Sequence, residues 1–294
     1  MIDERYHIYS LAAVFFALAI GIVIGTSISR YPSSEGEKRT VERYERWMKV
    51  LKTEIEKASH EARETSALAR SSEEFCQAVL PIIARDKLAW RNVAIVRTGG
   101  SDELSGSVKR ALELAGAQVT SVTEISREFA FDDDGKIAQA LLDSGLPPLN
   151  AGQKPRDKLW GIVARGICDG THSELLAELE KRGIAELSGR YEKANKLVVL
   201  VGGAKSKRAN TAESMDAQLL AQMDGPDVVV VGCEGKDASS SYVPVWRKAG
   251  IATVDNADTA VGQMALLCAL NGERASFGVK KTADRLIPQS LESE

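Results

Sequence analysis

The chain has 294 residues, a formal net charge of −3 and an apolar content of 44%, which together allow one large domain or two small ones. Charged residues make up 27% and aromatic residues 5%, which excludes a collagen-like or low-complexity chain. The near-neutral charge argues against a nucleic-acid partner, and four cysteines are too few for a disulfide scaffold.

The N-terminal region contains an uncharged apolar segment. Residues 8–28 form a run of 21 without a charge, and as a helix they would span roughly 30 Å, the thickness of a bilayer's hydrocarbon core. We therefore predict a short tail at 1–7 and a single transmembrane helix at 8–29. The alternatives are a buried helix of a soluble domain and a cleavable signal peptide ending at 27–29. Against the signal peptide, the segment is longer than a usual apolar core and its start is acidic.

Small residues recur at every fourth position of this segment, on one face of the predicted helix. Such a ridge lets two membrane helices approach closely, although glycine and alanine are also common in membrane helices that stay single. The predicted packing residues are Ala13, Ala17, Gly21 and Gly25. The expected partners are the lipid bilayer and a second copy of the chain.

A charged segment follows, and its composition predicts a long, coiled-coil-like helix over 35–85. Its first five core positions are apolar, as in a parallel dimer, and the later ones are mostly small or polar. A single solvated helix, or one that packs on its own domain, is the alternative. Counting sevens from Val41 gives the core positions Val41, Tyr44, Met48, Leu51, Ile55, Ala58, Ala62, Thr65, Ala69, Ser72, Cys76, Val79 and Ile83.

The remaining chain alternates short apolar runs with amphipathic stretches, which is typical of a parallel sheet covered by helices on both faces. We predict an α/β domain at 90–288 and a tail at 289–294. The domain is expected to be a doubly wound (Rossmann- or flavodoxin-like), mostly parallel, five-stranded sheet. Its predicted strands are 93–96, 118–122, 197–201, 228–231 and 251–254.

Candidate ligand-binding residues follow three of these strands. In open α/β sheets, ligands bind at the carboxyl ends of the strands, where glycines let backbone amides meet an anion. No nucleotide-binding motif is present, however, and tight turns use glycine without any ligand. The candidates are Thr98, Gly99 and Gly100, then Gly202 and Gly203, then Asp255 and Asn256.

Catalytic and metal-ligating patterns are absent from the sequence. The three histidines and four cysteines are isolated, and no Gly-x-Ser-x-Gly elbow occurs. We therefore predict no catalytic residues, no metal ligands and no resident cofactor, and we expect that the chain is not an enzyme.

Two stretches resemble the MctB family of mycobacterial copper transport proteins. The first is SLAAVFFALAIGIVIG at 10–25, and the second runs from TVDNADT at 253–259 to FGV at 277–279. The resemblance implies a role in copper export as a pore-forming component of the outer membrane, with copper as the transported ion. It also implies that the C-terminal domain faces away from the cytoplasm. Counting basic residues around the membrane segment points the other way.

Three hypotheses follow. The first is a membrane-anchored envelope protein of copper homeostasis, whose single apolar helix can line a pore only as an oligomer. The second is a structural scaffold, in which a single-pass coiled-coil dimer presents an α/β domain to envelope partners. The third is an α/β domain that binds a small ligand or catalyses a reaction at its glycine turns.

Overall fold

The computed structural model describes residues 4–29, 35–145, 149–150, 152–223, 225 and 227–291. The outer parts of both predicted tails, 1–3 and 292–294, lie outside this range. The chain divides into two compact units, Met1–Ala69 and Arg70–Glu294. The second unit begins before the predicted domain at 90–288, because it includes the last turns of the long helix.

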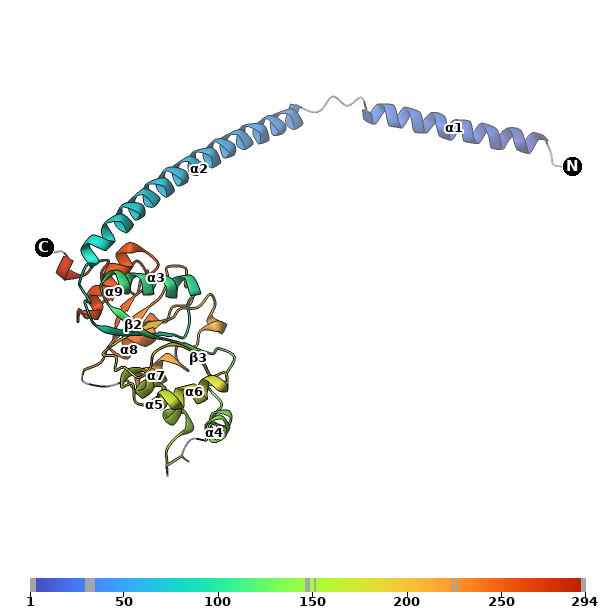
Figure 1. Cartoon of the computed structure of the whole chain (residues 1–294). Coiled ribbons are helices and arrows are strands. Elements are labelled where there is room, and N and C mark those ends of the chain that lie inside the picture. The colour runs from blue at the N-terminus through green and yellow to red at the C-terminus, as the bar shows by residue number, and fades with distance from the viewer. Residues whose placement is uncertain are drawn as a thin grey trace. The chain divides into compact units, whose positions relative to one another are not determined.

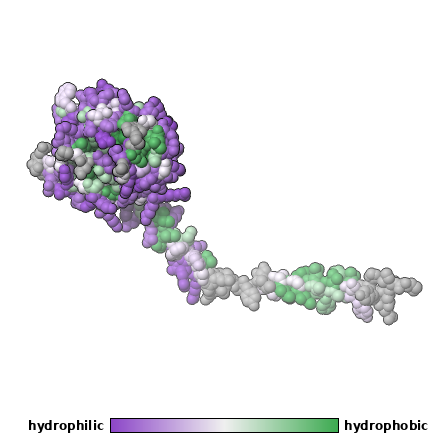
Figure 2. All heavy atoms as spheres, turned by 90° about the horizontal axis from the view of Figure 1, so that it is seen from below, coloured by the Kyte–Doolittle hydropathy of each residue, from purple (hydrophilic) through white to green (hydrophobic). Residues whose placement is uncertain are grey.

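Helix α1 (Glu4–Ser29) contains the predicted membrane segment. Residues Ile8–Ser27 form the one stretch of the described chain that is long and apolar enough to cross a membrane. The large apolar side chains described in this stretch are all at least half exposed, and Figure 2 shows them as an apolar surface along the helix. By length and composition, α1 is therefore a candidate membrane-spanning helix.

Helix α2 (Glu35–Ala84) is a single helix of 50 residues, close to the predicted range. In the first unit its apolar side chains are exposed, and ion pairs spaced four residues apart, such as Lys52–Glu56, lie on its surface. Such pairs each add only ~0.3–0.5 kcal/mol to the stability of a helix. The pairing of this helix with another stays a prediction.

The last turns of α2 pack on the α/β unit. Leu80 and Ala84 are buried in its core, and Cys76 is partly buried against the same cluster. The Glu73 carboxylate also accepts a hydrogen bond of 2.8 Å from the Ala260 N–H, at the start of another helix. The alternative interpretation of the long helix, packing on its own domain, therefore holds for these turns.

The α/β unit is built on one mostly parallel sheet. Its described residues form seven strands in the order β3-β2-β1-β4-β5-β6-β7, so the predicted number of five is wrong. All neighbouring strands are parallel except β2 and β3. The strands are β1 (Asn92–Arg97), β2 (Gln118–Ile125), β3 (Ala185–Gly189), β4 (Leu197–Val201), β5 (Val229–Cys233), β6 (Ala252–Val254) and β7 (Ser276–Phe277).

The five predicted strands correspond to β1, β2, β4, β5 and β6, and the two unpredicted strands lie at the edges of the sheet. Strand β3 is largely exposed and has no apolar run, because only one of its faces meets the core. Strand β7 has only two residues. Edge strands of this kind lack the continuous apolar pattern by which buried strands are recognised.

Helices cover both faces of the sheet (Figure 1). One face carries α3 (Asp102–Leu114), α9 (Ala260–Leu270) and the end of α2, whose apolar residues form one core cluster with the strands. The other face carries a second cluster built around Trp160 and Trp246. Its helices are α4 (Asp134–Asp143), α5 (Pro155–Cys168), α6 (Ser173–Lys181), α7 (Asp216–Leu220) and α8 (Val243–Lys248).

Candidate functional site

The carboxyl ends of β1 and β4 bring the first five candidate residues together. The Thr98 and Gly99 N–H groups donate to the Val201 carbonyl at 3.0 and 3.1 Å, and Gly100 N–H donates to the Gly203 carbonyl at 2.8 Å. Gly202 N–H donates to the Cys233 carbonyl of β5 at 2.9 Å. The sequence suggested that backbone N–H groups at these turns could bind an anion. In the structure these N–H groups instead form hydrogen bonds between neighbouring strand ends.

Glycine is required in these turns by the close approach of the backbones. A Cβ on Gly99 would lie 2.7 Å from the Gly203 carbonyl oxygen, and Gly100 and Gly203 have φ angles of +70° and +91°. A side chain would therefore clash at Gly99 and strain the backbone at the other two positions. Contacts within the chain are therefore enough to explain these glycines, and ligand binding at these turns stays a prediction.

A second reason for glycine is the Trp246 indole, which lies against the sheet. A Cβ on Gly202 or Gly232 would come within 2.6 or 2.4 Å of this ring. The indole N–H donates a hydrogen bond of 2.6 Å to the Asp216 carboxylate, so the ring is held in place by a buried acid. The glycines at the ends of β4 and β5 thus make room for Trp246.

The Asp216 side chain is fully buried beneath the turn that follows β1. Burial raises the pKa of its carboxyl from 3.8 to about 7, and the hydrogen bond from the Trp246 N–H only partly opposes this effect. Sequence reasoning missed Asp216, because nothing in its local pattern distinguishes it from an acidic residue at a helix start.

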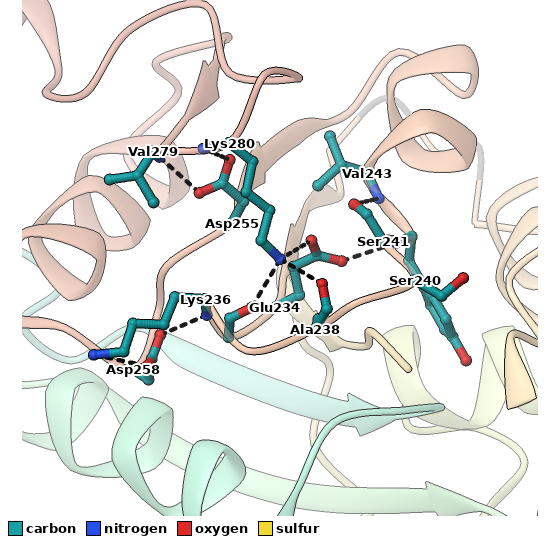
Figure 3. A network of polar contacts seen from close by, with 12 residues as sticks. Glu234, Lys236, Ala238, Ser240, Ser241, Val243, Asp255, Asp258, Val279 and Lys280 are labelled. Carbon is teal, nitrogen blue, oxygen red and sulfur yellow. Dashed lines mark hydrogen bonds and ion pairs between the residues drawn. The ribbon is translucent and has the colours of Figure 1, made fainter. Parts of the chain in front are cut away.

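A partly buried ion pair lies at the carboxyl end of β5 (Figure 3). The Lys280 ammonium donates three hydrogen bonds: to the Glu234 carboxylate at 2.7 Å, to the Gly235 carbonyl at 2.9 Å and to the Ala238 carbonyl at 3.1 Å. The second carboxylate oxygen of Glu234 accepts the Tyr242 N–H at 2.8 Å, and Glu234 is fully buried. All three donor positions of the ammonium are therefore used to tie the 234–242 loop to residue 280.

The last two candidates follow β6 and are also buried. The two oxygens of the Asp255 carboxylate accept N–H groups of Val279 and Lys280 at 2.8 and 3.0 Å, which shapes the turn after β7 (Figure 3). Asn256 is 3% exposed and its backbone carbonyl accepts from Thr259, the N-cap of α9. The structure thus places Asp255 in the network of Lys280, and Glu234 of this network lies against the turn at 202–203, where a Cβ on Gly203 would come within 3.1 Å of its side chain.

Beside the Gly100 turn, a polar groove of about 820 Å³ opens between the ends of β1 and β2 and the start of β3. Arg97 in this groove pairs with Asp102 at 2.6 Å and with Glu124. Acidic residues outnumber basic ones along the groove, six to two, which opposes the binding of a phosphate group. The charged residues are Arg97, Asp102, Glu103, Glu124, Arg127, Glu128, Glu180 and Glu186.

Thiols and histidines are dispersed in the fold. Burial raises the pKa of Cys168 to about 12 and also raises the pKa of Cys233, so both stay protonated. Cys76 is partly buried, and Cys168, Cys233 and Cys268 are buried. Among the residues that the structure describes, no three His, Cys, Asp or Glu side chains come together as a metal-binding group.

The predicted packing residues of the membrane helix are accessible. Ala13, Ala17, Gly21 and Gly25 lie in the exposed part of α1, and a Cβ added at either glycine would meet no atom within 4 Å. The helix therefore presents a smooth face to its surroundings, and its packing against a second helix stays a prediction.

Comparison with known proteins adds evidence that is independent of this geometry. The sequence profile of the family described as "Copper transport outer membrane protein, MctB" matches residues 1–288. Proteins named "Copper transporter MctB" from Mycobacterium tuberculosis and Mycobacterium bovis are 27% identical over 301 aligned positions, covering 92% of each chain. The protein of the same name from Mycobacterium leprae is 25% identical, covering 98% of this chain and 100% of the relative.

Proposed function

The chain belongs to the MctB family of copper transport outer membrane proteins, and we propose that it acts in copper homeostasis as a membrane-anchored protein of the cell envelope. The observation that carries the proposal is the extent of the match, which reaches from α1 to the end of the α/β unit at residue 288. Because the mycobacterial relatives align over nearly their whole length, the likeness is not confined to an apolar helix that many unrelated proteins share.

In this proposal the copper ion is the cargo, as the names of the relatives indicate, and the chain carries no resident cofactor. Anchoring comes from Ile8–Ser27, which is long enough to cross the bilayer once. The α/β unit is placed outside the cytoplasm, in keeping with the outer-membrane description of the family. The excess of basic residues after the span opposes this orientation, so orientation needs a direct measurement.

A pore component would have to be oligomeric. A single helix cannot enclose a channel, and α1 has few polar side chains that could line a pore. One of them, the Thr26 hydroxyl, donates to the Val23 carbonyl of its own helix. We therefore propose that any conducting form contains several copies of α1, packed through the face that carries Gly21 and Gly25.

The test is the copper content of cells that lack the chain. Deletion is expected to raise cell-associated copper and copper sensitivity, and the full-length chain is expected to restore both. Zinc measured in the same cells is the matched control, because a general defect of the envelope would change both metals. Copper content that is unchanged by deletion would rule out the proposal.

A second candidate is the structural scaffold, a single-pass dimer that presents the α/β unit to envelope partners. The observation that favours it is the set of apolar side chains on α2 that no described part of the chain covers, among them Val41, Tyr44 and Met48, each more than half exposed. Deletion would then alter envelope integrity with no selective change in copper. The copper-to-zinc comparison therefore also separates the two proposals.

A further inference from the structure

A pocket of about 860 Å³ lies at the amino ends of β5 and β6, at the opposite edge of the sheet from the glycine turns. It forms where the sheet is staggered. The first pair between these two strands joins Val231 to Ala252, so Val229 and Val230 of β5 extend past the start of β6. Both of these valines line the pocket, which therefore occupies a position that β6 leaves open.

The wall of the pocket is mainly apolar and comes from several elements. Leu220 of α7 and Val230 of β5 belong to the core but each stay 8% exposed, and Val245 of α8 and Ile251 are only partly buried. These side chains line the space without filling it. Small-molecule sites in proteins are typically concave, mostly apolar and roughly 300–1,000 Å³ in volume, with a few polar groups that orient the ligand.

Two basic side chains supply such polar groups. Lys248 lies in the last turn of α8 and Arg274 lies between α9 and β7, and neither pairs with any residue that the structure describes. The neighbouring Arg247, by contrast, pairs with Asp284 at 3.0 Å. Glu213 also lines the pocket, but it forms no ion pair with Lys248 or Arg274. The described lining therefore has an excess of positive charge that a ligand can neutralise.

We propose that this pocket binds a small amphiphile, an apolar chain with one anionic head group, as in a fatty acid. The chain lies against the apolar wall, and the head group accepts charge-assisted hydrogen bonds from Lys248 and Arg274. A small inorganic anion would leave the apolar wall in contact with water, and a neutral hydrocarbon would gain nothing from the two basic groups. The proposal goes beyond the role in copper homeostasis and does not rest on it.

The test is photolabelling of the full-length chain with dodecanoate that carries a diazirine. The chain is held in discs of phosphatidylcholine, so that no detergent competes for the pocket. Peptide mapping should place label within 217–230 and 245–252, the segments that form most of the wall. Unlabelled dodecanoate or dodecyl phosphate should remove this label, and the stronger competitor identifies the head group. Dodecanol and acetate, each with half of the required chemistry, should compete at least tenfold less well.

Variants test the two parts of the pocket separately. Lys248→Met combined with Arg274→Met removes both charges and should lower labelling of the pocket roughly tenfold or more, because hydrogen bonds to charged groups are among the stronger ones. Ala221→Trp fills the space from an exposed position of the wall and should lower labelling as far. Lys109→Met on α3, at the other face of the sheet, is the matched control and should leave labelling unchanged.

All of these positions are exposed, so the thermal unfolding of the α/β unit should be the same in every variant. Label that dissolves in the lipid also reaches α1, and this background should not differ between variants. Absence of competed label from the two segments would overturn the proposal. Competition by dodecanol or acetate equal to that by dodecanoate, or full labelling of the double variant, would overturn it as well.

Discussion

The residues at the carboxyl ends of the parallel strands make close contacts with one another and with distant parts of the chain, and these contacts fill the turns in which a ligand was considered. Thr98, Gly99, Gly202 and Gly203 were candidates for binding a ligand. In the structure their backbone groups bond to neighbouring strand ends: Thr98 and Gly99 donate to Val201, Gly202 donates to Cys233, and Gly203 accepts from Gly100. The sequence could predict that they gather at one edge, because parallel strands end there together. It could not predict the contacts of Trp246 and Lys280. Trp246 lies 44 residues after Gly202 in the chain, and Lys280 lies 46 residues after Glu234.

The buried carboxyl of Asp216 predicts a pH-dependent stability. Its pKa is 3.8 in an ordinary setting and about 7 in the fold, so between these values only the folded state holds the proton. The free energy of unfolding should therefore fall as pH rises from 4 to 7, by at most ~1.4 kcal/mol per pH unit. Asp216→Asn keeps an acceptor for the Trp246 N–H and carries no charge, so it should remove this slope.

The measurement is urea unfolding of the full-length chain in detergent at several pH values, followed by tryptophan fluorescence. Wild-type protein and Asp216→Asn are compared, with Glu113→Gln as an exposed carboxyl control that should leave the slope intact. An equal slope in wild type and Asp216→Asn would contradict the assignment of the effect to this residue.

The ion pair of Lys280 and Glu234 predicts non-additive mutational effects. Lys280→Met leaves the fully buried Glu234 carboxylate without its partner, which should cost ~3–5 kcal/mol of unfolding free energy. Adding Glu234→Gln removes the uncompensated charge, so the double variant should be more stable than Lys280→Met alone. Denaturant titration of the four proteins measures the coupling, and additive losses would show that the two groups do not interact.

At the scale of elements, most strands and helices follow from apolar patterning. Strands β1, β4, β5 and β6 were predictable because their residues are largely buried and read as short apolar runs. Strand β2 instead mixes valine and isoleucine with buried serine and threonine. Strand β3 is an edge strand with one covered side, and β7 is too short to leave a pattern. For the last turns of α2 the sequence left two alternatives, a coiled coil and packing on the chain's own domain, because a heptad count does not reveal which side of a helix meets the domain.

The packing of α8 against β5 predicts an intolerance to any side chain at Gly232. A Cβ there would come within 2.4 Å of the Trp246 ring, so Gly232→Ala should cost at least ~1–3 kcal/mol of unfolding free energy. Gly106→Ala in α3 is the matched control, because its new methyl group meets only a flexible arginine end at 3.5 Å. Alanine is also the better helix former, so Gly106→Ala should be neutral or stabilising. Similar losses of stability in both variants would contradict this packing argument.

For the whole molecule, both proposed functions require the α/β unit to lie outside the cytoplasm. The sequence predicted the order of the parts, a membrane helix, a long charged helix and an α/β unit, because each has a distinct composition. It could not fix the orientation, because the basic residues after the span favour one side and the family description favours the other. Native Cys233 cannot report the orientation, because it is fully buried.

The most direct measurement is labelling of Glu113→Cys, an exposed position on α3, in a Cys76→Ser background with a membrane-impermeant maleimide. A cytoplasmic cysteine protein in the same cells controls for leakage. We expect Glu113→Cys to be labelled in intact cells to the same extent as in lysates, while the control is labelled only after lysis. Labelling of Glu113→Cys only after lysis would place the α/β unit in the cytoplasm and contradict an anchored envelope protein that handles copper outside it.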